Sequence, residues 1–362
     1  MTPRILILAA TLALVAVAYG ISNLILEVSL LLYDPYPMNN SEEKEVAIIH
    51  TTTSRGKRQR PNPNGMTTAT PQSSSSSSTT LELKMVTMNI AGLVPSQSAP
   101  DSWSTALQKE ALRAELLASD PDIIALQECP SQDWAASGIF NSDNNDDNDK
   151  TMYRLVGSAP SHAGFVSLVV RAGLDATLLD LGEDYVPIAA ATVSWHGKQI
   201  VVASVHLQPF EQGSLRRKEQ ITTLMAASAA ADALIFAGDT NMRDSEDATM
   251  EESLHLMDAW KVAGASESTR FSWDTMSHMY GEDKKKSSEW QNLYYGAATR
   301  AYQRRYDRVY IRGSPLQQQP VLQVHVPAFD LIANQPVSES RYHFLSDHFG
   351  IALRLELNWT AP

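Results

Sequence analysis

The sequence contains a single cysteine, Cys129, among 362 residues. A disulfide within the chain is therefore excluded, and so is a zinc site built from several cysteines. Basic residues are also in the minority, because 29 Lys and Arg stand against 41 Asp and Glu and give a net charge of -12. Bulk charge therefore does not favour nucleic acid, and any such binding needs a local basic cleft.

The signature motifs of several common enzyme classes are absent as well. The sequence contains no G-x-x-x-x-G-K, G-x-G-x-x-G, G-x-S-x-G or H-E-x-x-H. Their absence argues against nucleoside-triphosphate hydrolysis, dinucleotide binding, serine hydrolysis and zincin chemistry. The chain is nevertheless globular in composition, because 43% hydrophobic residues supply enough apolar mass for a sizeable core.

One long apolar run is present, and it lies at the N-terminus. Arg4 precedes an uncharged stretch over residues 5–26, which Glu27 ends. This stretch is long enough to cross a bilayer as a helix, and the flanking charges favour an N-terminus on the inner side. The A-x-A pattern Ala16–Ala18 is instead typical of a cleaved signal peptide. We interpret residues 1–38 as a signal-anchor or signal peptide, which predicts membrane attachment through residues 5–26 or entry into the secretory pathway.

Residues 39–80 have the composition of a linker. They contain a basic cluster at Arg55–Arg60 and a serine tract at Ser73–Ser78. Such polar sequence buries too little apolar surface to offset the entropy of ordering, so we predict that this segment is disordered. From residue 81 onward strand and helix patterns alternate without a repeat or a second linker, which indicates one α/β or α+β domain over residues 81–358.

Within that domain the hydrophobic pattern separates strands from helices. Alternating residues and short apolar runs predict strands, whereas longer amphipathic stretches predict helices. Strands are expected at residues 83–89, 122–128, 164–170, 189–195, 199–206, 234–238, 306–312 and 351–357, and helices at residues 105–119, 214–231 and 251–263.

Acids, amides and histidines recur where the predicted strands begin or end. Strand ends at one edge of a sheet are places where a rigid scaffold brings side chains together. Any one such residue is more often a packing residue, but so many at strand ends are hard to explain by packing alone. The residues are Asn89, Glu128, His206, Asp239, Asn241, Asp307, Asp347 and His348.

The residue types indicate a hard cation and phosphate chemistry. Carboxylate and amide oxygens without a Cys/His cluster suit magnesium or manganese better than zinc. Hydrolysis of a phosphate ester needs a metal that offsets phosphoryl charge, a base that aligns water and donors that hold the transition state. This constellation contains candidates for each of those parts.

The order of these motifs resembles the endonuclease/exonuclease/phosphatase superfamily over nearly all of residues 83–356. Within it, the chain is most similar to the type-2 tyrosyl-DNA phosphodiesterases. The resemblance implies a four-layer sandwich of two packed β-sheets flanked by helices, with the site along one rim. The motifs that carry it are Thr87–Leu93, Leu126–Glu128, Val205–Leu207, Phe236–Asp244, Phe271–Thr275, Arg305–Val309 and Ser346–Ile351.

The resemblance also implies a role for each candidate residue. Glu128 is expected as the main Mg²⁺ ligand, with Asn89 close by and Asp347 in or near the coordination shell; Mn²⁺ is an alternative ion. Asp307 is expected to orient either His348 or His206. The further expected roles are water activation for Asp239, phosphate contacts for Asn241 and His206, charge stabilisation for His348, and contacts to the DNA end for Arg243 and Trp273.

The implied reaction is hydrolysis of 5′-phosphotyrosyl-DNA bonds by a monomeric catalytic domain, a DNA-repair activity that would place the protein in the nucleus. The chain departs from the family pattern at Met88 and Ala91, which replace a Trp and an acid, and at Gln208 and Pro209, which replace an acid and a serine. Metal-dependent phosphodiester hydrolysis is therefore predicted more firmly than the tyrosyl substrate. The alternatives are a membrane-tethered or secreted nuclease, a phospholipid or inositol phosphodiesterase, and a non-enzymatic binding module on a membrane stalk.

Overall fold

The computed structural model describes part of the chain, and every described residue belongs to its second unit, Ser73–Pro362; the first unit is Met1–Gln72. The predicted anchor and all of the predicted linker except Thr80 lie outside the described residues. Within the described part, no helix combines the length and apolarity that a membrane span requires. The described ranges are residues 80–93, 99–135, 139–140, 152–182, 186–274, 303–314, 321–339 and 343–360.

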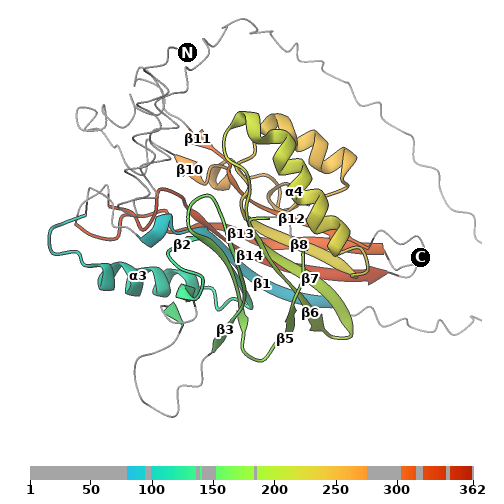
Figure 1. Ribbon diagram of the computed structural model, residues 1–362, viewed down its shortest axis with the longest axis horizontal. Helices are drawn as coiled ribbons and strands as arrows, with labels where there is room; N and C mark the ends of the chain where they lie inside the picture. The colour runs from blue at the N-terminus through green and yellow to red at the C-terminus, as the bar shows by residue number, and fades with distance from the viewer. Residues whose placement is uncertain are drawn as a thin grey trace, which may run out of the picture. The chain divides into compact units, whose positions relative to one another are not determined.

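Two six-stranded sheets form the centre of the fold (Figure 1). In the first sheet the central strand β1 pairs parallel with β2 and antiparallel with β14. The strands of this sheet, in spatial order, are β13 (Val321–Ile332), β14 (Gly350–Thr360), β1 (Thr80–Asn89), β2 (Ile123–Cys129), β4 (Phe165–Arg171) and β3 (Tyr153–Pro160).

The second sheet repeats the combination of a parallel central pair with antiparallel neighbours. Strand β7 runs parallel to β8, and β8 pairs antiparallel with β12. A separate short ribbon consists of β10 (Trp273–Asp274) and β11 (Gln303–Arg304). The strands of the second sheet, in spatial order, are β5 (Asp175–Leu178), β6 (Ile188–Trp195), β7 (Lys198–His206), β8 (Ala233–Asp239), β12 (Asp307–Gly313) and β9 (Met257–Asp258).

Alternation along the strands separates the core between the sheets from the layers outside them. In β1, Leu83 and Met85 pack toward the second sheet, whereas Val86 and Met88 face the opposite way. Side chains of a strand point to opposite faces in turn, so one strand serves two apolar layers. The largest of the three apolar clusters lies between the sheets, and its burial contributes hydrophobic stabilisation.

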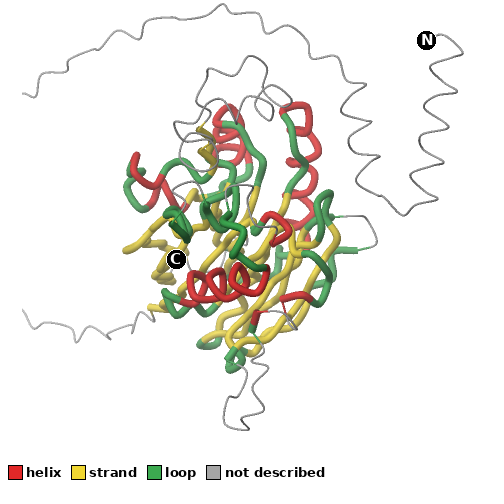
Figure 2. The backbone as a smooth tube through the Cα atoms, turned by 90° about the vertical axis from the view of Figure 1, so that its left-hand side faces the viewer, coloured by secondary structure: helices red, strands yellow, loops and turns green. Residues whose placement is uncertain are grey.

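Helices cover the outer faces of both sheets (Figure 2). The helix α3 (Thr105–Leu117) begins at the N-cap Ser104 and packs Leu112 and Leu116 on the first sheet. The helix α4 (Ser214–Ala227) packs Ile221 and Leu224 on the second. The order of layers is therefore helix, sheet, sheet, helix, which confirms the expected four-layer α+β sandwich.

Each predicted strand is present, but the prediction over residues 251–263 was wrong. That stretch contains the end of a π-helical turn (Thr249–Ser253), the strand β9 and the single-turn helix α5 (Ala259–Val262). Pairing of β9 with the edge of β12 overrides the local helical preference. The predicted helix over residues 214–231 also ends earlier, at Ala227, where Ser228 caps it.

Besides the two-residue strands β9, β10 and β11, three strands were not predicted: β3, β5 and β13. All three lie at sheet edges. Edge strands bury only part of one face, so their hydrophobic alternation is weak. β13 alternates between exposed and half-buried residues only over Val321–His325, and its remaining residues are mostly half-buried.

A buried polar contact joins the two sheets just below the rim. Gln127 of β2 donates through Nε2 to Ser204 Oγ of β7 at 3.0 Å and to Thr87 Oγ1 of β1 at 3.3 Å. Gly238 lies directly against it, with φ +146°, and a Cβ on Gly238 would be 2.1 Å from Val205 O and 2.8 Å from Gln127 Nε2. Only glycine allows the backbone of β8 to approach so closely.

We predict that Gly238→Ala destabilises the fold by about 3 kcal/mol, because the added methyl meets backbone as well as a buried side chain in a strained backbone conformation. Urea unfolding at constant protein concentration measures the change. Gly173→Ala is the matched control, since nothing lies within 4 Å of its Cβ position, and it should change the free energy of unfolding by less than about 1 kcal/mol. Equal effects of the two substitutions would contradict the close approach of β8 to Gln127.

Candidate active site

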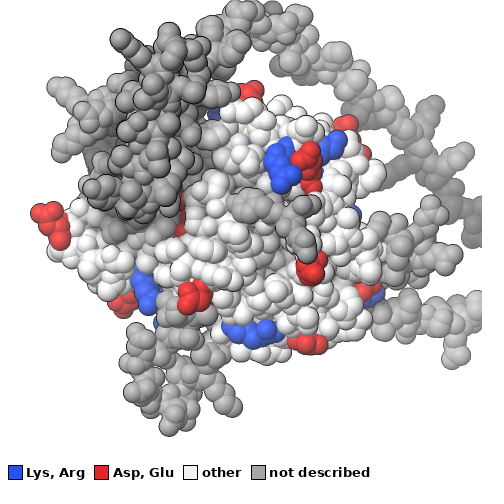
Figure 3. Space-filling model, in the orientation of Figure 1, with Lys and Arg blue, Asp and Glu red and all other residues white. Residues whose placement is uncertain are grey.

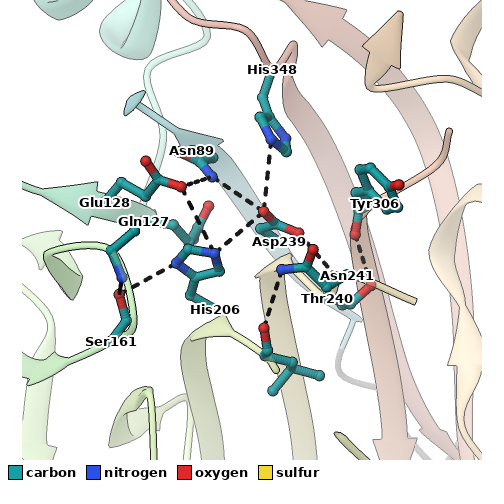
Figure 4. A network of polar contacts seen from close by, with 12 residues as sticks. Asn89, Gln127, Glu128, Ser161, His206, Asp239, Thr240, Asn241, Tyr306 and His348 are labelled. Atoms are coloured by element: carbon teal, nitrogen blue, oxygen red, sulfur yellow. Dashed lines mark hydrogen bonds and ion pairs between the residues drawn. The ribbon is translucent and has the colours of Figure 1, made fainter. Parts of the chain in front are cut away.

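The candidate site lies where strands of both sheets end at one rim (Figure 4). Asn89 and Glu128 stand at the carboxyl ends of the parallel strands β1 and β2. His206 and Asp239 are register partners at the carboxyl ends of the parallel strands β7 and β8, and Asp307 opens β12 opposite Asp239. Parallel pairing puts equivalent strand ends at the same edge, so both sheets deliver their polar residues to one place.

Asn89 joins a carboxylate of its own sheet to one of the other sheet. Its Nδ2 donates to Glu128 Oε1 at 3.0 Å and to Asp239 Oδ2 at 3.2 Å. Its Oδ1 accepts a hydrogen bond from Ala91 N at 3.0 Å, which fixes the orientation of the amide. The amide nitrogen of Asn89 therefore faces both acids.

Asp239 occupies the centre of the constellation and is only 3% exposed. Its Oδ2 accepts the hydrogen bond from Asn89 Nδ2 and lies 3.5 Å from His206 Nε2 and 3.8 Å from His348 Nε2. Its Oδ1 accepts from the backbone N of Asn241 at 2.9 Å. This arrangement holds both carboxylate oxygens in place.

The expected acid–imidazole pair is formed by Asp307 with His348 rather than with His206. His348 Nδ1 lies 2.8 Å from Asp307 Oδ2, deep in the rim. Burial opposes a charge on His348, but the carboxylates of Asp307 and Asp239 outweigh it and raise the pKa of His348 well above its usual value. His348 is therefore a cation at neutral pH. Asp307 is in turn held through its backbone, since Asp307 N donates to Ser272 Oγ at 2.9 Å.

His206 differs from His348 in its charge state. It is 1% exposed, and burial together with the cationic His348 lowers the pKa of His206 to about 3. Its Nε2 faces Asp239 and, at 3.9 Å, Glu128 Oε1. Its Nδ1 lies 3.4 Å from Ser161 Oγ. His206 is therefore a neutral imidazole at physiological pH, held between the acids and the turn that contains Ser161.

The acidic residues of the rim have the chemistry of a hard-cation site. Burial, and then the neighbouring carboxylate of Asp347, raises the pKa of Glu128 to about 7. Among the described residues, no lysine or arginine forms an ion pair with Glu128 or Asp347. A pair of neighbouring carboxylates without a lysine or arginine partner among the described residues fits Mg²⁺ or Mn²⁺. The loop that carries Asp347 is tied to β1, because Ser346 Oγ donates to Asn89 O at 2.7 Å.

A second acidic cluster lies elsewhere in the domain, and unlike Glu128 and Asp347 its carboxylates are paired with lysine and arginine. Ligand atoms of Asp247, Glu251 and Asp258 lie within 4.8 Å of one another. Protein cations already neutralise this cluster, so its carboxylates offer an added ion little unpaired charge. The pairs are Arg305 with Asp247 and Asp258, Arg308 with Asp247, and Lys261 with Asp247 and Glu251.

The two residues predicted to contact substrate flank an aromatic ring that the prediction did not single out. The guanidinium of Arg243 lies 5.0 Å from the ring centroid of Tyr306, and Arg243 Nη1 donates to Asn241 O at 2.7 Å. Trp273 packs against the same ring at 5.7 Å between centroids and is only 7% exposed. Tyr306 in turn lies 6.4 Å from the ring of His348. Arg243 is thus at the rim, whereas most of Trp273 is buried.

The prediction also missed the turn between β3 and β4. Its Ser161 contacts His206, and the rings of His162 and His206 lie 3.9 Å apart between centroids. The only available signal was a polar pair just before a predicted strand, which is equally typical of an ordinary turn.

A buried ion pair supports the rim from below. Arg217 of α4 donates to Glu246 through Nη2 at 2.6 Å and Nε at 3.0 Å. Arg217 Nη1 also donates to Gln208 O, in the segment after His206, at 2.7 Å. Glu246 accepts in addition from the backbone N of Arg243 at 2.9 Å. One pair of side chains therefore holds the two segments that follow β7 and β8.

Comparison with known proteins identifies the family. The profile of the Endonuclease/Exonuclease/phosphatase family matches residues 86–348, which is most of the chain, and the chain therefore belongs to that family. It is 25% identical over 281 residues to the 5′-tyrosyl-DNA phosphodiesterase of Caenorhabditis briggsae, covering 75% of this chain and 68% of the relative. It is 30% identical over 165 residues to tyrosyl-DNA phosphodiesterase 2 of Danio rerio, covering 44% of this chain but only 39% of that relative.

Solved structures bear out the fold. A humanised Danio rerio TDP2 superposes with a TM-score of 0.52 at 19% identity, over 76% of this chain and 98% of that one. Danio rerio TDP2 complexed with a single-strand DNA product gives a TM-score of 0.51 at 18% identity, with the same coverage of both chains. At these identities the likeness establishes a shared architecture.

We predict that Glu246→Gln lowers the free energy of unfolding by about 2–4 kcal/mol at pH 7, because it leaves Arg217 buried without its counter-charge. Burial opposes ionisation of Glu246, but Arg217 and Arg243 N outweigh it and lower the pKa of Glu246 below its usual value. The stabilisation is therefore present above about pH 4.3 and is lost as the pH falls through the folded-state pKa. The difference between wild type and variant should shrink correspondingly in acid.

Urea unfolding at pH 7, 5 and 3.5 measures this difference. Glu219→Gln is the control, since Glu219 pairs with Arg216 at 3.1 Å on the exposed face of α4. It should change the free energy of unfolding by less than about 1 kcal/mol at every pH. A difference for Glu246→Gln that stays constant with pH would count against an ionised, paired Glu246.

Proposed function

We propose that this protein is a metal-dependent phosphodiesterase that hydrolyses 5′-phosphotyrosyl bonds in DNA. One observation carries the proposal: Asp239 is held between Asn89, His206 and the cationic His348, beside the acidic pair of Glu128 and Asp347. A fixed carboxylate, a cation and a hard-ligand pair at one point are the parts that phosphate-ester hydrolysis requires. The names of the relatives from Caenorhabditis briggsae and Danio rerio support the tyrosyl-DNA substrate.

In this proposal Asp239 orients and deprotonates the attacking water. Its Oδ1 is fixed by Asn241 N, while Oδ2 points into the group formed by Asn89 and the two histidines. A base whose rotamer is locked in this way needs little reorganisation when water attacks. Asn241 itself is anchored by its side chain to Leu207 O at 3.1 Å.

His348 stabilises the negative charge that develops on the phosphoryl group. Its charge is maintained by Asp307, which is fully withdrawn from solvent and has no competing basic partner among the described residues. A cation already in place costs no solvent reorganisation at the moment of reaction. A Mg²⁺ or Mn²⁺ ion held by Glu128, with Asp347 and Asn89 nearby, would offset the charge on the phosphoryl oxygens.

The substrate bond suits a site of this kind. The phenol of tyrosine has a pKa near ~10, so it leaves with less protonation than a sugar alcohol requires. Electrostatic stabilisation can therefore replace a strong general acid. The expected products are a DNA 5′-phosphate and a free tyrosine on the adducted protein.

Binding of DNA ends has to come from local contacts. On the face of the described domain seen in Figure 3, basic side chains are few and are interspersed with acidic ones. Arg243, stacked on Tyr306 beside Asn241, is the basic residue best placed to meet a DNA end at the rim. The Danio rerio TDP2 structure that carries a single-strand DNA product supports this class of partner. Attachment of the domain to a membrane through residues 5–26 and the linker 39–80 remains a separate prediction.

We predict that excess EDTA abolishes hydrolysis, with a loss of more than about 100-fold, and that Mg²⁺ or Mn²⁺ restores it. The full-length chain is assayed before and after metal is returned. Glu128→Ala should lose activity to a similar extent and should not recover at any Mg²⁺ concentration that restores wild type. Asp175→Asn, at an exposed acid of the edge strand β5, is the control and should retain full activity. Undiminished hydrolysis in EDTA would refute the metal requirement.

We predict that the full-length protein cleaves a 5′-phosphotyrosyl oligonucleotide at least about 100-fold faster than unmodified DNA or a choline phospholipid. All three substrates are assayed side by side, because the family also fits a nuclease or a lipid phosphodiesterase. Asp239→Asn should lose about 10²- to 10⁴-fold on the preferred substrate, since it removes the proposed base. Faster cleavage of plain DNA or of the phospholipid would replace the proposed substrate while keeping the chemistry.

A further inference from the structure

The segment between β13 and β14 brings Asp347 to the rim on a backbone that is otherwise buried. Within residues 343–350, Asp347 is half-exposed and every other residue is buried. Ser346 Oγ donates to Asn89 O at 2.7 Å, which ties the segment to β1. A ligand side chain that reaches out from a buried backbone takes its position from the groups that hold that backbone.

The helix α3 holds the same segment through two of its polar side chains. Gln108 is fully buried, and its Nε2 donates to Leu345 O at 2.7 Å, two residues before Asp347. Glu115 Oε1 accepts from Ala333 N at 2.7 Å, where the segment leaves β13. Leu345 also belongs to the apolar cluster that contains the buried face of α3. The backbone that leads to Asp347 is therefore held by α3 through a hydrogen bond as well as through apolar packing.

Trp103, which lies just before α3, fixes the orientation of the Gln108 amide. Its Nε1 donates to Gln108 Oε1 at 2.8 Å. An indole N–H can only donate and a backbone carbonyl can only accept. The amide therefore satisfies both partners only with its oxygen toward Trp103 and its nitrogen toward Leu345. Trp103 also packs edge-on against His343 of the same segment, with 4.5 Å between ring centroids and 88° between planes.

The proposed metal site needs such support because its acids oppose each other. Burial, and next the charge of Asp347, raises the pKa of Glu128, so the two carboxylates lie close together. Like charges at short range repel each other until a cation lies between them. A backbone that is held from β1 and from α3 keeps Asp347 beside Glu128 before the ion binds, and a site formed in advance binds more tightly.

We propose that Gln108 is a positioning residue for the divalent ion: it holds the backbone that carries Asp347 in place beside Glu128, and Trp103 keeps its amide in the orientation that this requires. Gln108 acts through Leu345 and is not itself a ligand. The proposal rests on the proposed function only in requiring a divalent ion at the rim, and it does not depend on the substrate.

Binding of Mn²⁺ to the full-length protein, measured by electron paramagnetic resonance without substrate, tests this role directly. Binding that Glu128→Ala abolishes is counted as binding at the rim. Gln108→Met keeps the length of the side chain and removes both hydrogen-bonding groups, so we expect the Kd for Mn²⁺ to rise by about 10-fold. Trp103→Phe keeps a ring against His343 but leaves the amide free to turn, and should raise the Kd by about 3- to 5-fold.

Tyr153→Phe is the matched control. Tyr153 donates through its hydroxyl to Pro121 O at 2.8 Å, a buried hydrogen bond to a backbone carbonyl just before β2, at the end of that strand opposite to Glu128. This variant should lower the melting temperature as Gln108→Met does, but its Kd for Mn²⁺ should stay within about 2-fold of wild type, because the change is far from the rim.

A Kd for Gln108→Met within about 3-fold of wild type, or an equal rise in Tyr153→Phe, would overturn the proposal. If Gln108→Met does not fold, Trp103→Phe decides, and a Kd within about 2-fold of wild type overturns the proposal. Failure of the wild type to bind Mn²⁺ would refute this proposal together with the metal requirement. Intact Mn²⁺ binding without cleavage of the tyrosyl substrate would refute the proposed substrate alone and leave the comparison of Kd values decisive.

Discussion

The close approach of the two sheets at Gln127 is the constraint on which the site depends. Gln127 donates to Ser204 and Thr87, and Gly238 makes room for the contact because it has no side chain. Thr87 and Ser204 lie two residues before Asn89 and His206, and Gln127 lies one residue before Glu128. The polar contact therefore sets the spacing of the rim, where Asn89 reaches across from Glu128 to Asp239. A core of apolar side chains alone would hold the sheets together but would specify their register less sharply.

In the rim, the neighbouring groups decide which side chains of the same chemical type carry a charge. His348 is a cation because two carboxylates face it, whereas His206 is neutral because burial and the nearby cation oppose its protonation. Burial and the neighbouring carboxylate of Asp347 raise the pKa of Glu128, because both oppose a negative charge on it. Environments that give chemically alike groups such different pKa values are typical of sites that move protons and stabilise charge.

The outer layers of the domain serve this rim as well as the core. Arg217 of α4 and Glu246 form a buried pair that holds the segment after His206 and the backbone of Arg243. Breaking such a pair is costly mainly because it leaves a buried charge without a partner. Stability and site geometry are therefore coupled, and damage to the pair is expected to loosen Arg243 and the segment beyond β7 together.

The sequence by itself determined the strands that build the rim and most of the residues that stand on it. Alternation in residues 83–89 and apolar runs such as 234–238 are local patterns, so they identify β1 and β8 without knowledge of their neighbours. Only the tertiary structure decided which side chains meet at the rim: that Asp307 holds His348, that Tyr306 lies under Arg243, and that the rings of His162 and His206 are in contact. These contacts join segments far apart in the chain. Strand pairing within each sheet and packing of the two sheets on each other bring those segments together, and no local pattern encodes either. The same cause explains the wrong helix over residues 251–263, where pairing of β9 with β12 outweighs the local helical preference.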